Sequence, residues 1–112
     1  MSIGSGDLPL LPELRFDLPA PDVEVPFTVA TLLADRTRAG ILRILADGPH
    51  CVCEMAATLG ERQNNVSNHL ARLRDAGLVR ASRHGADSRR VYYERDDEAC
   101  AAAARALDGL LR

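Results

Sequence analysis

Residues 61–79 read ERQNNVSNHLARLRDAGLV and decide the fold of this chain. Val66, Leu70 and Leu73 recur at the spacing that lines up side chains on one face of an α-helix, so they predict a helix that buries one face. Gly77 follows this apolar series and predicts the end of the helix, because glycine readily takes the left-handed conformation found after a helix C-terminus.

The other sides of this helix carry residue types that bond to DNA. Asn and Gln bond bidentately to adenine, Arg to guanine, and Ser to bases or phosphates, when a helix enters the major groove. A polar helix surface is also typical of a solvated face, so the neighbouring segments decide between the two interpretations. The candidate contacts are Gln63, Asn64, Asn65, Ser67, Asn68 and Arg72.

The neighbouring segments favour the DNA interpretation. The amphipathic segment 51–59 ends at Gly60, and a short turn separates it from the polar helix, which is the layout of a helix-turn-helix. Residues 78–83 and 89–94 predict two strands, with a turn at 84–88 between them. A helix-turn-helix followed by a hairpin predicts a winged helix, an α+β fold that is mainly α. The hairpin adds four candidate DNA contacts, Arg83, His84, Arg89 and Arg90.

The charge distribution supports a nucleic-acid partner although the chain has a formal net charge of −2. Residues 62–90 hold seven arginines against two aspartates, a formal charge of +5, so the remainder carries −7. Positive charge gathered on the predicted helix and hairpin is what binding to double-stranded DNA requires, because neutralising phosphates supplies much of the affinity.

The sequence indicates a cytoplasmic protein that makes no membrane contact. No stretch approaches the roughly 20 apolar residues that span a bilayer. No lysine or arginine precedes Arg15, unlike in a secretory signal. Two of the three cysteines form the triplet Cys51-Val52-Cys53, which suits a reducing compartment and metal or redox chemistry rather than a structural disulfide.

The chain divides into an arm, residues 1–25, and one domain, residues 26–112. Five of the six prolines fall within the first 26 residues, so we expect the arm to be extended. Helices are predicted over residues 27–34 and 38–46, the second capped by Asp35 and Thr37. An alanine-rich helix follows Asp96, and we expect the terminal helices to pair with a second copy and form a homodimer that reads a palindrome.

An enzyme is not indicated. The sequence shows no paired carboxylates, no nucleophile with its base, and no glycine loop that cradles phosphate.

Several motifs, taken in order, resemble the ArsR/SmtB family of metalloregulatory repressors over roughly residues 26 to 111. The resemblance implies a homodimeric winged helix that binds operator DNA and releases it when a metal or metalloid ion binds. The motifs are residues 34–38 (ADRTR), 51–56 (CVCEMA), 65–70 (NVSNHL), 74–79 (RDAGLV) and the pair Tyr92-Tyr93.

The resemblance also assigns a role to Cys51 and Cys53. Family members with Cys-Val-Cys at this place bind arsenite, or soft ions such as cadmium and lead, through both thiolates. Soft sulfur donors select soft ions, and we expect a helix N-terminus to lower the thiol pKa. As(III) is therefore the expected inducer, with Sb(III), Cd(II), Pb(II) and Hg(II) as alternatives. Residues i and i+2 of a regular helix point about 200° apart, so the first turn must be irregular for one ion to reach both sulfurs.

The third ligand stays open at this stage. Arsenite sensors of the family have a third cysteine where this chain has Ala56, and the arm holds neither Cys nor His. Cys100, Glu54 and His50 are the candidates, and for arsenite an external thiol is another. We expect His69 to be bonded by its neighbours within the fold. A thiol redox switch is a less favoured alternative, because a disulfide between residues i and i+2 is strained.

Overall fold

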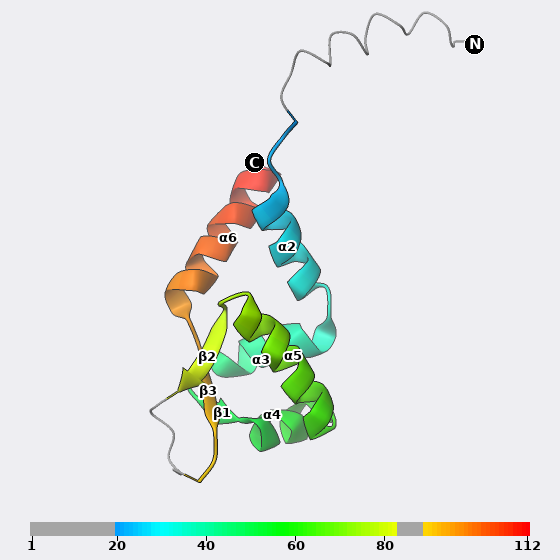
Figure 1. Cartoon of the computed structure of the whole chain (residues 1–112), viewed down its shortest axis with the longest axis vertical. Helices are drawn as coiled ribbons and strands as arrows, with labels where there is room; N and C mark the ends of the chain where they lie inside the picture. The colour runs from blue at the N-terminus through cyan, green and yellow to red at the C-terminus, as the bar shows by residue number, and fades with distance from the viewer. Residues whose placement is uncertain (1–19, 83–88) are drawn as a thin grey trace, which may run out of the picture.

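A computed structural model describes residues 20–82 and 89–112 of the chain (Figure 1). None of the helices in these residues is long and apolar enough to cross a membrane. The helices are α2 (Glu24–Leu33), α3 (Arg36–Leu45), α4 (Val52–Leu59), α5 (Gln63–Asp75) and α6 (Asp97–Leu111), and the strands are β1 (His50–Cys51), β2 (Val79–Ser82) and β3 (Tyr92–Arg95).

The helix-turn-helix predicted from the sequence is confirmed by α4 and α5. Gly60 takes a φ of +67° after α4 and turns the chain toward α5. The predicted apolar stripe of α5 is buried, and Gly77, with a φ of +83°, ends the helix. The Leu78 amide donates to the Leu73 carbonyl at 3.0 Å, which satisfies one of the free carbonyls at the helix end.

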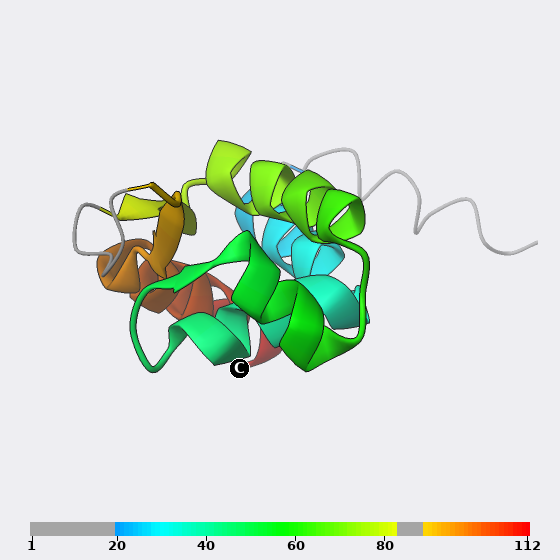
Figure 2. The same cartoon turned by 90° about the horizontal axis from the view of Figure 1, so that it is seen from below.

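The core lies where α3, α4 and α5 meet the sheet. Burying these aliphatic side chains stabilises the fold by the hydrophobic effect, which is roughly proportional to the apolar area removed from water. Seen from below, α4 and α5 lie next to each other with the hairpin at one side (Figure 2). The core side chains are Ile41, Leu45, Met55, Ala56, Val66, Leu70, Leu73, Leu78 and Val79.

The winged-helix hairpin is formed by β2 and β3, which pair antiparallel with Val79 opposite Arg95 and Ser82 opposite Tyr92. The sequence predicted that the returning strand begins at Arg89. In the structure it begins at Tyr92. The register explains the difference, because the four residues of β2 find all their partners between Tyr92 and Arg95. The predicted turn at 84–88 lies outside the described residues.

Strand β1 was not predicted. His50 lies opposite Tyr93 and Cys51 opposite Tyr92, so β3 is the middle strand in the order β1-β3-β2. The sequence placed Cys51 in the helix, which was wrong: Cys51 is the extended residue before α4, with φ −88° and ψ 165°. A pair of residues is too short to show the alternation that marks a strand.

Helix α2 begins at Glu24, three residues before the predicted start. Pro26 is tolerated because it lies in the first turn, where backbone N–H groups have no partner within the helix. Of the two predicted caps of α3, Asp35 is confirmed, since its carboxylate accepts from the Arg38 amide at 3.0 Å. Thr37 was wrong as a cap: α3 begins at Arg36, two residues before the predicted start, so Thr37 lies inside the helix and its hydroxyl donates to the Glu61 carboxylate at 3.4 Å. Figure 1 shows α2 and α6 converging at one end of the molecule, with α4 at the other.

Candidate functional site

The candidate reading face is the exposed side of α5. Gln63, Asn64, Ser67 and Asn68 are exposed and follow an i, i+1, i+4, i+5 pattern, so they share one face of the helix. Arg72, also exposed, lies one turn further on. These polar side chains are placed as a helix entering the major groove would need them.

Some of the predicted DNA contacts also have partners within the fold. The Asn65 amide nitrogen donates to the Glu61 carboxylate at 2.8 Å, which leaves Asn65 half-buried beside the turn. Arg89 and Arg90 are exposed on the hairpin, and Arg90 also reaches the thiols described below. The predicted contacts Arg83 and His84 lie outside the described residues.

Arg38 connects α5 to the end of α2 on the side of α5 that faces the protein. Its side chain is only 9% exposed, yet it is charged. It donates to the Leu32 carbonyl at 2.6 Å and the Thr31 carbonyl at 3.1 Å, both near the end of α2, and contacts His69 Nδ1 at 3.0 Å. His69 therefore has a partner inside the fold, as the sequence predicted, and Arg38 links α2 directly to the reading helix.

The cysteine pair lies in an open pocket of about 350 Å³ beside the N-terminus of α5. Cys51 is 2% exposed and Cys53 is half-buried. Because Cys51 is extended, the pair escapes the regular helical geometry that would aim the two side chains apart. The pocket is lined by Cys51, Val52, Cys53, Gln63, Arg90 and Val91.

Arg90 is the charged side chain among the described residues that line this pocket. Its Nη1 atom lies 3.4 Å from Cys53 Sγ and 4.0 Å from Cys51 Sγ. The contact was not predicted from the sequence, which assigned Arg90 to DNA alone. The contact of Arg90 with the sulfurs depends on the pairing of β3 with β1. A local sequence pattern does not predict such a tertiary pairing.

The pKa of Cys53 is raised, contrary to the expectation that the helix N-terminus would lower it. The main cause is a hydrogen bond with the Cys51 thiol, followed by burial and by repulsion from Cys51, while the Arg90 charge acts in the opposite direction. Two sulfurs this close resist double deprotonation until a bound ion compensates their charge.

Glu54 and His50 lie beside the pair but are engaged with the backbone and each other. The Glu54 carboxylate accepts from the Cys51 amide at 2.9 Å, a contact that stabilises the start of α4 and holds the pKa of this carboxyl below its usual value. His50 Nδ1 is 3.5 Å from the same carboxylate. Among residues 20–82 and 89–112, no three His, Cys, Asp or Glu side chains gather closely enough to hold a metal ion.

Cys100 is not brought to the pair. Its thiol donates to the Leu78 carbonyl at 3.7 Å and packs against the core, and burial raises its pKa. It lines a different cavity, between α2, α3 and α6. The third ligand that the sequence left open is thus not supplied by Cys100 in this arrangement.

An exposed polar helix, a bracing helix and a two-stranded hairpin define a winged helix-turn-helix regulator of transcription. Residues 35–81 match the family described as bacterial regulatory protein, arsR family. The chain is also 35% identical to the arsenical resistance operon repressor of Escherichia coli K12 over 85 residues, which are 75% of this chain and 70% of that repressor. The chain belongs to the ArsR family of DNA-binding regulators and is not an enzyme.

Solved structures of similar proteins agree with this assignment. A possible transcriptional regulator for arsenical resistance superposes with a TM-score of 0.67 at 27% identity, covering 76% of this chain and 85% of the other. The antimony-specific repressor AntR gives a TM-score of 0.55 at 31% identity, covering 75% of each chain. Among the curated relatives, this chain spans 70% of the length of the Escherichia coli repressor and 61% and 55% of two other regulators.

Proposed function

We propose that this chain is a homodimeric cytoplasmic repressor that binds operator DNA and releases it when arsenite, or a related soft ion, binds Cys51 and Cys53. One observation carries the proposal: the pocket that holds both sulfurs is also lined by Gln63, the first residue of the reading helix, and by Arg90 of the hairpin. An ion in this pocket would therefore lie next to both elements that we propose to face DNA.

The chemistry of the pocket favours soft, thiol-binding ions. Two sulfurs suit As(III), Sb(III), Cd(II), Pb(II) and Hg(II), whereas magnesium and calcium prefer oxygen ligands. The names of two similar proteins, one an arsenical resistance repressor and one antimony-specific, support a trivalent metalloid as the inducer.

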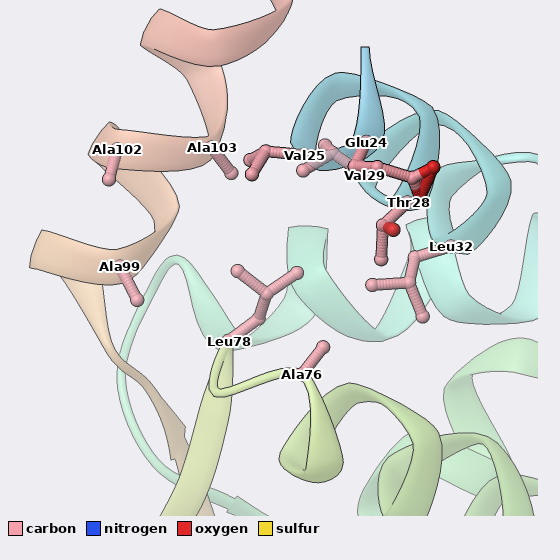
Figure 3. A pocket seen from close by; sticks show the side chains of 10 residues that line it. All are labelled: Glu24, Val25, Thr28, Val29, Leu32, Ala76, Leu78, Ala99, Ala102 and Ala103. Atoms are coloured by element: carbon pink, nitrogen blue, oxygen red, sulfur yellow. The ribbon is translucent and has the colours of Figure 1, made fainter. Parts of the chain in front are cut away.

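The dimer is proposed from the apolar surface of α2 and α6. Phe27 is 63% exposed and Leu111 is 81% exposed, which is costly for large apolar side chains in water. A cavity of about 370 Å³ opens between the two helices, and Figure 3 shows Val25 of α2 facing Ala103 of α6 across it. A second copy covering this surface would pair two reading helices about a two-fold axis, as a palindromic operator requires.

Titration with ions tests the proposal directly. The operator is first selected from a random duplex pool, and the purified chain is then titrated on it with each ion. We expect arsenite to lower operator affinity by about ten- to a hundredfold, the range of ordinary allosteric coupling. Sulfur-to-arsenic absorbance should rise at the same stoichiometry. Continued operator binding with every thiol-binding ion at saturation would contradict the proposal.

Asn68 tests the reading face independently of the ion. Replacing it with alanine removes a side chain that bonds base edges but carries no charge, so affinity for the selected operator should fall about tenfold. Affinity for an unrelated duplex should change little, because non-specific binding depends on phosphate contacts. Fluorescence anisotropy on both duplexes measures this, and an equal loss on both would show that Asn68 does not read sequence.

A further inference from the structure

Arg90 lies with its guanidinium next to the two sulfurs that are proposed to bind the ion. Its guanidinium contacts both sulfurs, at 3.4 Å for Cys53 and 4.0 Å for Cys51. It precedes β3 by two residues, and Tyr92, the first residue of β3, pairs with Cys51. The pairing of the sheet thus brings the backbone next to Arg90 close to the strand that carries Cys51.

The charge of the pocket lining bears on which ions the pocket would bind. Of its described lining residues, Arg90 is the one with a charged side chain, and the others offer thiols, an amide and apolar groups. A guanidinium donates hydrogen bonds and neither accepts them nor ligates metal ions. Its positive charge therefore disfavours a centre that keeps residual positive charge, such as a divalent metal ion, and its N–H groups can donate to an oxygen atom bound there.

Arsenite carries such an oxygen. Arsenous acid, As(OH)₃, condenses with two thiols to give (RS)₂As–OH and two molecules of water; two As–O bonds are replaced by two As–S bonds, and arsenic stays trivalent. The remaining hydroxyl completes the three bonds of arsenic, so no third protein ligand is needed. An arsenic bound in this way is consistent with the described residues, among which no third His, Cys, Asp or Glu side chain joins the two cysteines.

We propose that Arg90 sets the ion selectivity of the Cys51–Cys53 pocket: it donates a hydrogen bond to the hydroxyl left on a bound trivalent metalloid and opposes divalent cations. This inference rests on the proposed function, because it takes both sulfurs as ligands. It adds that the hairpin supplies a specificity residue, and that the missing third cysteine is replaced by an oxygen of the ligand itself.

The test compares two ions on the full chain without DNA. Wild type, Arg90→Gln and Arg90→Lys are each titrated with arsenite and with Cd(II), and the dissociation constants are read from sulfur-to-ion absorbance. Arg90→Gln should weaken arsenite binding about tenfold, the usual effect of losing one hydrogen bond from a charged donor, and should not weaken Cd(II) binding. Arg90→Lys keeps the charge, so it should retain most of the discrimination against Cd(II).

Arg89→Gln is the matched control, since it removes the same charge from the neighbouring exposed residue, which does not line the pocket. It should leave the ratio of the two dissociation constants at the wild-type value. An unchanged ratio in Arg90→Gln, or an equal loss for both ions, would overturn the inference. Failure of wild type to bind either ion would overturn the proposed function as well, so the two failures are distinguishable.

Discussion

Replacing Cys51 or Cys53 with serine is expected to abolish arsenite-driven release while operator binding persists. A serine hydroxyl stays protonated and is a hard donor, so each variant loses one of the two bonds that hold the ion. Serine is close to cysteine in size and is a favoured residue before a helix, so the start of α4 should be preserved at position 51.

The measurement is anisotropy of a labelled operator duplex, titrated with each variant in the presence and absence of arsenite. Cys100→Ser is the matched control, because the Cys100 thiol bonds to the Leu78 carbonyl and lies outside the pocket. It should respond to arsenite as wild type does. Normal release of a Cys51 or Cys53 variant would exclude the pocket as the sensor, and loss of response in Cys100→Ser would identify a third sulfur ligand.

The second large effect is expected at Arg38, where methionine should lower the free energy of unfolding by about 3 kcal/mol. Methionine keeps an apolar stem of similar length but donates no hydrogen bond. The Leu32 carbonyl and the Nδ1 atom of His69 would then lose a partner in a half-buried position, and the Thr31 carbonyl would keep only the Ala34 amide at 3.3 Å. Leaving buried acceptors unsatisfied is costly because they have also lost water.

Urea denaturation followed by circular dichroism measures this loss. Arg36→Met is the matched control, since Arg36 is exposed on the same helix, and its stability should change by no more than about 0.5 kcal/mol. Equal stability of the two variants would show that the Arg38 contacts contribute little. Since Arg38 joins the end of α2 to His69 on α5, its loss should also weaken operator binding.

The sequence predicted the parts of the fold that rest on local, repeating signals. The stripe of Val66, Leu70 and Leu73 extends over about two helical turns, and Gly77 and Asp35 are local signals for a helix end and a helix cap. Strand β1 has only two residues and pairs through the tertiary fold, so it left no periodicity to detect.

The candidate site was predicted in residue type but not in its contacts. The spacing of Cys51 and Cys53, together with the family resemblance, predicted that both sulfurs bind one ion. The approach of Arg90, 37 residues after Cys53 in sequence, depends on closure of the hairpin. Burial of Arg38 could not be predicted either, because arginine is usually exposed and its partners, the carbonyls at the end of α2 and His69, are brought together only by the tertiary fold.

The pairing of β1 with β3 connects the proposed ion-binding cysteine directly to the hairpin. Cys51 lies opposite Tyr92 in the sheet, so under the proposed function a backbone shift at Cys51 on ion binding would be passed to the hairpin strand. Such a shift would pass through one backbone pair, Cys51 and Tyr92, and would not need the aliphatic core to rearrange. Substitutions at Arg90, which is exposed and outside the core, would then alter the ligand preference without removing a core side chain.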